Sequence, residues 1–259
     1  MPGLVIKPRS RIFHGHDWVY SSEVRKTFGE PEPGSVISLK DFKDRPLGTA
    51  IYNPQSQIVA RRFSRRKQDL DHAFFVRRIT MARDLRERLP VDPRLCRVVW
   101  SESDGLPGVI VDRYGDHLVL QTLTLAMDQR RDLIAEALTE VFSPASIILR
   151  NDSPIRKAED LPLENSILRG ENPGTVPVNH RGLTFHLDLL TGQKTGLYLD
   201  QLEAYERVAA NAQGLRVLDC FSNQGGFGLA CAQAGAAKVT CVDISEEAVN
   251  AVRENASAN

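Results

Sequence analysis

The chain has 259 residues, of which 42% are hydrophobic and 25% charged, proportions that are usual for a folded globular protein. No run approaches the roughly 18 consecutive apolar residues of a membrane helix, and the N-terminal MPGLVIKPRSRIFHGHDW has no secretory apolar core. These features exclude a helical membrane protein, so we expect a cytoplasmic chain without a membrane partner.

The net charge is zero, but it is unevenly distributed. Residues 1–95 hold 19 Lys and Arg against 11 Asp and Glu, a balance of +8, and residues 96–259 hold 14 against 22, a balance of −8. A basic end on a neutral chain is typical of a protein that meets a polyanion. A basic surface without any partner is an equally good reading of the charge alone.

Metal-ligating residues show no ligand spacing. The four cysteines (Cys96, Cys220, Cys231 and Cys241) form no CxxC pair and are expected to be small buried hydrophobes. His14 and His16 have no third ligand nearby, which favours a turn. We therefore expect neither a disulfide nor a metal site.

Residues 1–66 are expected to form a small β-barrel. Three short apolar runs, Ser35–Leu39, Gly48–Tyr52 and Gln57–Arg61, alternate with turn formers. A helical stripe follows over Asp69–Leu89 and ends at Pro90.

Residues 67–172 are expected to form a central α+β domain around that helix. A hairpin is predicted over Gly108–Gln121, a helix over Asp128–Phe142 and a strand over Ala145–Arg150. Residues 151–175 are polar and interrupted by prolines, which indicates a linker or an irregular insertion.

Residues 173–259 have the pattern of an open parallel sheet. A hairpin is predicted around His180–Gly182 and a helix near Tyr198–Ala212. A strand, a glycine-rich loop, a helix, a second strand and a second helix follow with short connections. The predicted class is therefore a multi-domain α/β protein: a β-barrel, an α+β domain and part of a Rossmann-like domain.

The strongest local motif is VLDCFSNQGGFG, Val217–Gly228. Glycines in a strand-to-helix turn let the backbone approach a ligand closely, and ligands of open α/β sheets bind beyond the carboxyl ends of the strands. The next strand ends at Asp243, 18 residues after Gly225, where a carboxylate can accept hydrogen bonds from a ribose. Together they predict an adenosine-containing ligand; a tight turn with a helix-capping aspartate is the alternative.

A second polar cluster, GQKTGLYLDQ at Gly192–Gln201, directly precedes this strand. By itself it is read as a turn and a helix start. With VLDCFSNQGGFG and CVDIS it resembles the class I rRNA large-subunit methyltransferases that carry an N-terminal PUA domain and methylate cytosine at position 5. RSRIFHGHDWVYSSEV and GTAIYNPQSQIVARRFS are similar to the PUA domain of that family, and SESDGLPGVIVDRYGDHLVLQ to its central domain.

The resemblance implies S-adenosylmethionine as cofactor and large-subunit rRNA as partner, and it leaves a homodimer open. The implied cofactor residues are Lys194, Thr195, Tyr198, Asp200, Gln201, Asp219, Phe221, Ser222, Gly225, Gly226, Phe227, Asp243, Ile244 and Ser245. The implied RNA-binding residues are Arg9, Arg11, Gly15, His16, Trp18, Arg61 and Arg62, with Trp18 open between core packing and base stacking. The chain departs from the family at Asn223-Gln224, where Tyr-Thr is more usual.

The family's cysteine nucleophile and its Asp-Pro-Pro-type segment have no counterpart in this sequence. Cys220, beside the glycine loop, is expected to be a strand residue. We therefore assign no catalytic residue and expect a truncated chain, inactive alone, whose two parallel strands leave apolar surface exposed.

Two other functions remain open. One is an RNA-binding module without catalysis. The other is a nicotinamide-dependent oxidoreductase, against which the G-G-x-G spacing and the basic N-terminal part both count.

Overall fold

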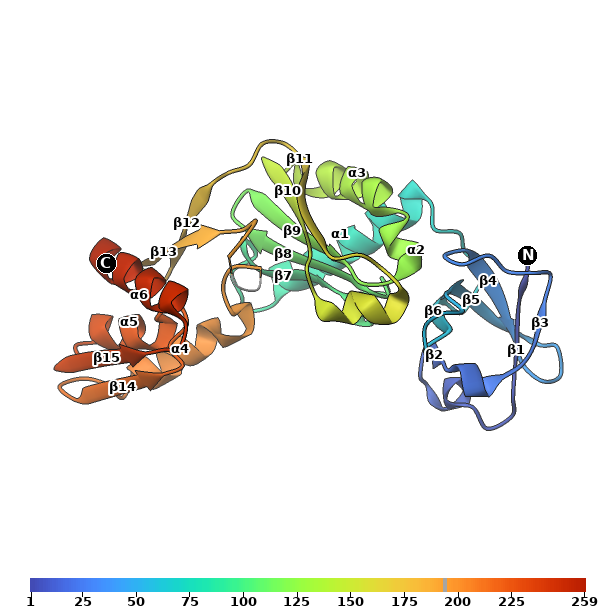
Figure 1. Ribbon diagram of the computed structural model, residues 1–259, viewed down its shortest axis with the longest axis horizontal. Coiled ribbons are helices and arrows are strands. Elements are labelled where there is room, and N and C mark those ends of the chain that lie inside the picture. Colours follow the sequence, from blue (N-terminus) through green and yellow to red (C-terminus); the bar gives the residue numbers. More distant parts are fainter. Residues whose placement is uncertain (193–194) are drawn as a thin grey trace. The chain divides into compact units, whose positions relative to one another are not determined.

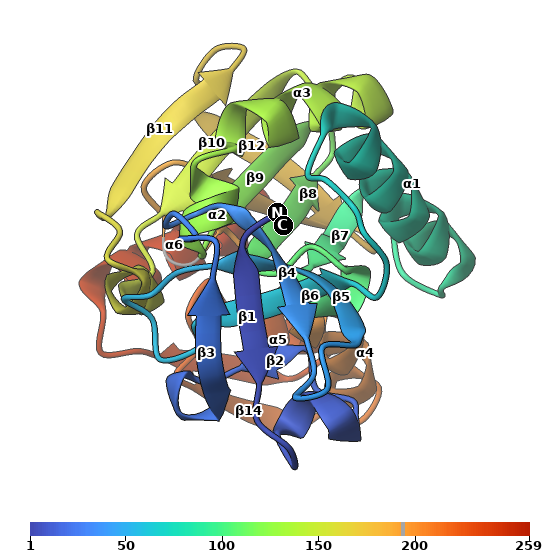
Figure 2. The ribbon, with the colours of Figure 1, turned by 90° about the vertical axis from the view of Figure 1, so that its right-hand side faces the viewer.

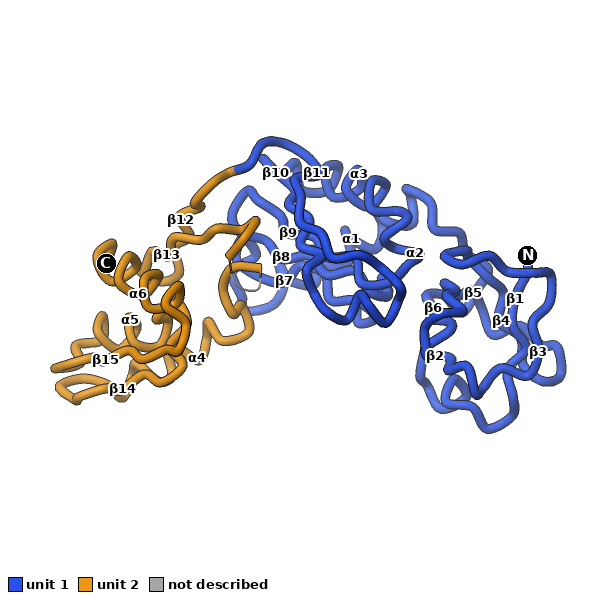
Figure 3. Tube along the Cα trace, in the orientation of Figure 1, with its two compact units in different colours: residues 1–172 blue, residues 173–259 orange. Residues whose placement is uncertain are grey.

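The computed structural model describes residues 1–192 and 195–259 and divides into two compact units, residues 1–172 and 173–259 (Figure 3). None of the helices within these described ranges is long and apolar enough to cross a membrane.

Unit 1 begins with a six-stranded sheet (Figures 1 and 2). Its strands are β1 (Gly3–Ile6), β2 (Trp18–Val19), β3 (Val24–Phe28), β4 (Val36–Lys40), β5 (Pro46–Tyr52) and β6 (Ala60–Ser64), with short 3-10 turns at Arg11–His14 and Ser21–Glu23. The order is β2-β6-β5-β4-β1-β3, with β1 and β4 parallel and the other neighbours antiparallel. The core of this sheet comes from alternate apolar residues such as Leu4, Ile6, Ile37 and Leu39.

The all-β prediction for residues 1–66 is confirmed, with two differences. The prediction lacks β1, β2 and β3, because β1 and β2 are short and the sequence of β3, VRKTF, lacks an apolar alternation. The predicted run Gln57–Arg61 lies mostly in a turn, and its strand is displaced to Ala60–Ser64. The edge strands β2 and β3 are not paired with each other in this fully described part of the chain, so no hydrogen-bonded closure joins them.

A second sheet of unit 1 follows, in the order β11-β10-β9-β8-β7. Its strands are β7 (Leu95–Trp100), β8 (Val109–Tyr114), β9 (His117–Thr122), β10 (Ser146–Asn151) and β11 (Glu164–Arg169). The helices are α1 (His72–Arg88), α2 (Leu125–Asp128) and α3 (Arg131–Phe142). In this sheet only β9 and β10 are parallel, a pairing that needs a crossover connection, which α2 and α3 supply.

Helices α1 and α3 lie side by side against this second sheet (Figures 1 and 2). Asp71 begins α1 by accepting a hydrogen bond from the amide of Phe74, 2.8 Å away. Phe74, Phe75 and Ile79 then enter a core that also contains Ile51 and Phe63 of the N-terminal sheet. Ile51 and Phe63 therefore join the core of the second sheet, while the N-terminal sheet keeps a separate core of its own.

The expected helices, the hairpin and the strand at 145–150 are confirmed, but the linker prediction is wrong. Residues 154–159 form a 3-10 turn and Glu164–Arg169 forms β11, which pairs antiparallel with β10. The segment has little apolar periodicity because polar contacts hold it to the sheet.

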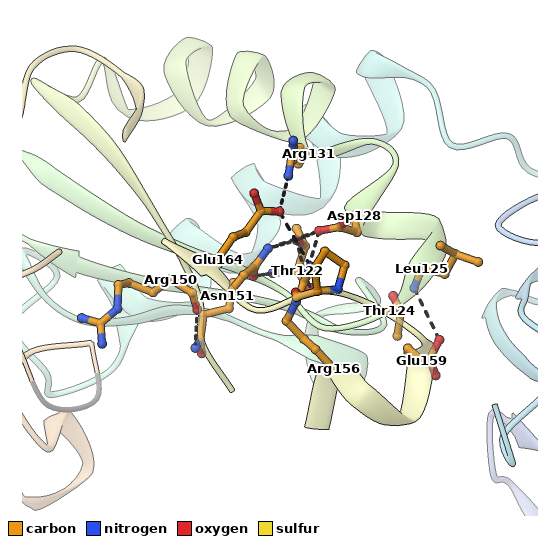
Figure 4. A network of polar contacts seen from close by, with 12 residues as sticks. Thr122, Thr124, Leu125, Asp128, Arg131, Arg150, Asn151, Arg156, Glu159 and Glu164 are labelled. Carbon is orange, nitrogen blue, oxygen red and sulfur yellow. Dashed lines mark hydrogen bonds and ion pairs between the residues drawn. The ribbon is translucent and has the colours of Figure 1, made fainter. Parts of the chain in front are cut away.

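Arg156 is the centre of these contacts and is fully buried (Figure 4). Its guanidinium donates to the carbonyl oxygens of Thr122 and Pro162 and to the carboxylate of Asp128, 2.9 Å away. Asn151 completes the network by bonding to the backbone amide and hydroxyl of Thr122. A buried charge is tolerated where it is paired and hydrogen-bonded in this way.

We predict that Arg156→Met lowers the free energy of unfolding of unit 1 by about 3 kcal/mol, because Asp128 and the Thr122 carbonyl lose a buried partner. Urea unfolding measured by tryptophan fluorescence tests this. Lys157→Met, an exposed neighbour in the same turn, is the matched control and should change stability by under about 0.5 kcal/mol. Equal effects of both substitutions would contradict the structural role of Arg156.

Unit 2 contains an antiparallel hairpin and a two-stranded parallel sheet. The hairpin is β12 (Thr175–His180) with β13 (Leu183–Asp188), and the parallel pair is β14 (Arg216–Cys220) with β15 (Lys238–Val242). The helices are α4 (Leu202–Ala209), α5 (Gly226–Gln233) and α6 (Glu246–Ala258), and a 3-10 turn at Leu199–Gln201 precedes α4. The predicted order of hairpin, helix, strand, loop, helix, strand and helix is confirmed.

The parallel strands of unit 2 leave apolar side chains at the surface, as the sequence predicted. Leu218 is 65% exposed and Val242 is 48% exposed. Parallel strands are usually covered on both faces.

Candidate functional site

The candidate site of unit 2 lies at the carboxyl ends of β14 and β15. These strands pair in parallel, with Asp219 opposite Cys241 and Cys220 opposite Val242. Asp219 is the last but one residue of β14, and Asp243 immediately follows β15. Parallel pairing therefore places the two carboxylates at the same edge of the sheet.

The loop between β14 and α5 is sharply turned. Phe221 and Asn223 have positive φ angles of 60° and 47°, which residues with a Cβ rarely adopt, and Gly225 has a φ of 83° at the N-cap of α5. The amide of Ser222 donates to the carbonyl of Val242, 3.1 Å away, and so ties the loop to the neighbouring strand. Such strain at two non-glycine residues is typical of functional loops.

Both carboxylates accept hydrogen bonds from backbone amides in or next to the loop. Asp243 accepts the backbone amides of Ser245, 3.0 Å away, and Asn223, 2.9 Å away, and these hydrogen bonds lower its pKa. Asp219 accepts the amide of Gly228 at 2.9 Å, yet its pKa is raised, first by burial and then by the negative charge of Asp243. Asp243 is therefore the more firmly ionised member of the pair.

Close packing explains the second glycine of the loop. A Cβ at Gly226 would overlap the ring of Tyr205 in α4, which also packs edge to face on Phe227 with ring centres 4.7 Å apart. Burial, followed by the charge of Asp219, raises the pKa of Tyr205 to about 12. Its hydroxyl is thus protonated at neutral pH.

The polar segment predicted from Gly192–Gln201 lies against the same loop. The side-chain amide of Gln224 donates to the carbonyl of Gly196, 3.0 Å away. Thr195 is buried, Asp200 is exposed and Gln201 closes a turn onto the carbonyl of Tyr198. Lys194 lies outside the described residues. The structure thus brings the two predicted motifs together.

The surface of the site suits a nucleoside ligand. Phe221 and Ile244, which follow the two strands, are 87% and 100% exposed, so apolar faces flank the carboxylates. The hydroxyl oxygen of Ser222 and the side-chain oxygen of Gln224 are buried and have no hydrogen-bond partner among the described residues. Buried polar atoms are normally satisfied, so these two are available to a bound molecule.

Two residues of the site were missed by the sequence analysis. Tyr205 has no signal beyond its place in a helix, and Asn255 none at all. The side chain of Asn255 donates to the carbonyl of Gln224 and accepts the amide of His186, so it joins α6, the loop and the hairpin. Only the folded topology brings these partners together.

The proposed RNA-binding residues of unit 1 fall into two groups. Arg9, Arg11 and His16 are exposed, and Gly15 ends a 3-10 turn with a φ of 94°. Trp18, Arg61 and Arg62 make internal contacts instead. The Trp18 indole donates to Glu102 at 2.7 Å, Arg61 pairs with Glu102 at 2.9 Å and lies over the Trp18 ring, and Arg62 pairs with Asp17 at 2.7 Å.

Trp18 and Arg61 therefore join the two sheets of unit 1. A role of the predicted set in RNA binding stays a prediction. Among the described residues, no three His, Cys, Asp or Glu side chains are grouped closely enough to hold a metal ion.

Two family models match the chain. Residues 7–65 match the PUA-like domain. Residues 156–259 match the S-adenosylmethionine-dependent methyltransferases. The second match contains the whole candidate site, from the polar segment to α6.

Curated relatives extend the similarity over nearly the whole chain. The ribosomal RNA large subunit methyltransferase I of Erwinia tasmaniensis is 37% identical over 252 residues, and that of Vibrio vulnificus is 36% identical over 259 residues. These alignments cover 96% and 98% of this chain. The chain spans 64% and 65% of the two relatives.

Solved structures share the fold. A Streptococcus mutans protein described as a SAM-dependent methyltransferase superposes with a TM-score of 0.82 at 23% identity, covering all of this chain and 68% of its own. A second methyltransferase structure, in complex with SAH, superposes with a TM-score of 0.84 at 24% identity. The match covers all of this chain and 67% of that protein. At these identities the similarity concerns the fold alone.

We predict opposite pH effects of the two carboxylates on the stability of unit 2. The pKa of Asp219 is raised above 3.8, so the folded state holds the proton of Asp219 more tightly than the unfolded state does. Asp219 therefore lowers the stability of unit 2 only at pH values at which it is ionised. The pKa of Asp243 is lowered below 3.8, so its contribution is present above that pH and is lost as pH falls through the folded value.

Hydrogen–deuterium exchange of peptides from residues 216–258 measures this, comparing each variant with the wild type at the same pH. Asp219→Asn should increase protection at pH 7, and the gain should vanish in acid. Asp243→Asn should decrease protection at pH 7, and this deficit should shrink below pH 3.8. If acid changed the protection of the two variants in the same direction, the opposite roles of Asp219 and Asp243 would be refuted.

Proposed function

We propose that this chain binds S-adenosylmethionine in unit 2 and serves the methylation of ribosomal RNA. The observation that carries the proposal is the pair of strand-end carboxylates, Asp219 and Asp243, around a glycine loop with unpartnered buried oxygens. The match of residues 156–259 to S-adenosylmethionine-dependent methyltransferases supports it, as does the similarity of the chain to ribosomal RNA large subunit methyltransferases.

Each part of the loop has a role in this proposal. Asp243, ionised and fixed by two amides, presents its remaining lone pairs to a ribose diol. Phe221 and Ile244, both exposed, would hold the adenine by apolar contact, and the tight turn at Gly225 and Gly226 would let the backbone approach the cofactor. Thr195–Gln201 would line the methionine side. Bound S-adenosylmethionine supplies an electrophilic methyl group.

The finer assignments rest on the resemblance. We propose large-subunit rRNA as the substrate and position 5 of a cytosine as the methylated atom. The comparisons do not support the expectation that the chain lacks a catalytic part and is inactive alone. That expectation and the expectation of a homodimer both stay predictions. An RNA-binding module without catalysis is the weaker alternative, since it gives the two carboxylates no ligand.

We predict that S-adenosylmethionine binds the 259-residue chain saturably in a calorimetric titration, and that NAD does not. Asp243→Ala should weaken binding roughly 10- to 100-fold, because hydrogen bonds to a charged group are lost. Glu254→Gln, an exposed carboxylate of α6, is the matched control and should leave the affinity unchanged. Binding of NAD, or unaltered binding by the Asp243→Ala variant, would count against the proposal.

A further inference from the structure

A cleft of about 520 Å³ lies within unit 1, between the end of β6, helix α1 and the 3-10 turn at Ser101–Asp104. Its volume falls in the range of roughly 300–1,000 Å³ that is usual for ligand sites. Of the residues assigned above to RNA, only Arg62 lines it. The cleft is therefore a separate feature from the exposed arginines near the N-terminus.

The negative charges that line this cleft are all paired with arginines, but not all of its arginines are paired with carboxylates. Each carboxylate in its wall already has an arginine partner: Asp17 with Arg62 at 2.7 Å, Glu102 with Arg61 at 2.9 Å, and Asp104 with Arg86 at 2.6 Å. Three further arginines, Arg65, Arg66 and Arg78, line the cleft without an ion-pair partner in the described part of the chain. The cleft therefore carries a net positive charge that an anion can neutralise.

Arg78 is held in place by its surroundings. Its guanidinium lies 5.6 Å from the ring centre of Phe74 and donates a long hydrogen bond of 3.5 Å to the carbonyl of Phe63. Gly105 leaves room for it, because a Cβ there would lie 2.9 Å from its central carbon. The Nε atom is buried and has no hydrogen-bond partner among the described residues. The Arg78 guanidinium is thus held in position while one of its hydrogen-bond donors remains unused among the described residues.

Arg65 and Arg66 stand on an anchored backbone. The hydroxyl of Thr49 donates to the carbonyl of Arg66 at 3.0 Å, and the Ser64 hydroxyl accepts the amide of Arg66 at 3.1 Å. Gly48, with a φ of 119°, allows this segment to approach β5, since a Cβ would overlap the Ser64 carbonyl. Both arginine side chains are exposed.

Part of the cleft wall is apolar. Met81 and Leu85 of α1, one and two turns after Arg78, are 56% and 45% exposed and line the same space. A free anion would use the arginines alone. A nucleotide uses both parts of the wall, because its phosphate meets the guanidinium groups while its ribose or base covers the apolar side chains.

We infer that this cleft binds the sugar–phosphate backbone of single-stranded RNA, with Arg65, Arg66 and Arg78 on the phosphates and Met81 and Leu85 against a ribose or base. The inference rests on the proposed function for the identity of the polyanion. It adds a second contact of the substrate RNA, separate from the cofactor site of unit 2.

Fluorescence anisotropy with a labelled single-stranded RNA of mixed sequence, between 50 and 200 mM KCl, tests the inference. The triple variant R65A/R66A/R78A should lower the slope of log K against log salt by about 2, because each phosphate contact contributes about 0.7 for single strands. Its affinity should fall roughly 10- to 100-fold. The matched control K67A/R77A/R88A removes the same charge from exposed positions of the same segments outside the cleft and should keep the wild-type slope.

A second variant leaves the arginines intact. Met81→Glu places a carboxylate at the exposed side of the cleft and should weaken RNA binding, whereas Met81→Leu should not. Circular dichroism melting of every variant establishes that unit 1 remains folded.

Equal losses in the two triple variants would overturn the inference, since they would show general attraction rather than a site. Unchanged binding by R65A/R66A/R78A would overturn it as well. If the wild-type chain binds no RNA, both the cleft assignment and the RNA partner of the proposed function fail. The calorimetric titration with S-adenosylmethionine then decides separately whether the cofactor assignment stands.

Discussion

The parallel pairing of β14 and β15 is the constraint on which the candidate site depends, because it places two carboxylates at one edge of a sheet. Two negative charges so close repel each other, and the raised pKa of Asp219 records part of that repulsion. Backbone amides offset it. Asn223 and Ser245 donate to Asp243 and Gly228 donates to Asp219, so the loop conformation and the charge pair stabilise one another.

This mutual dependence explains the unusual backbone of the loop. The amide of Asn223 can reach Asp243 only while the chain turns sharply, and the positive φ angles of Phe221 and Asn223 are part of that turn. Contacts from outside the loop hold it there: Tyr205 over Gly226, and Asn255 on the carbonyl of Gln224. Helices α4 and α6 thus contribute to a site whose ligand-facing residues lie elsewhere in the sequence.

Much of this arrangement could be predicted from sequence because its signals are local. The glycine loop, the strand ends and Asp243 are marked by short-range patterns of strand, turn and helix. What could not be predicted depends on long-range contact. The segment of Arg156 has no apolar periodicity and the pattern of a linker or an irregular insertion, although its buried guanidinium joins residues 122, 128 and 162. Gln224 was noted only as a departure from a family pattern, yet it links the two motifs.

The function of the arginines in the basic N-terminal part also depends on long-range contacts that the sequence does not reveal. A balance of +8 over residues 1–95 indicates a polyanion partner but does not say which cations are available. Trp18, Arg61 and Arg62 looked suited to RNA, and the fold engages all three in internal contacts. Those contacts also neutralise Asp17 and Glu102, which would otherwise repel a phosphate from the cleft. The paired arginines therefore neutralise the carboxylates of the cleft, and Arg65, Arg66 and Arg78, which have no ion-pair partner among the described residues, are the ones we infer to bind RNA.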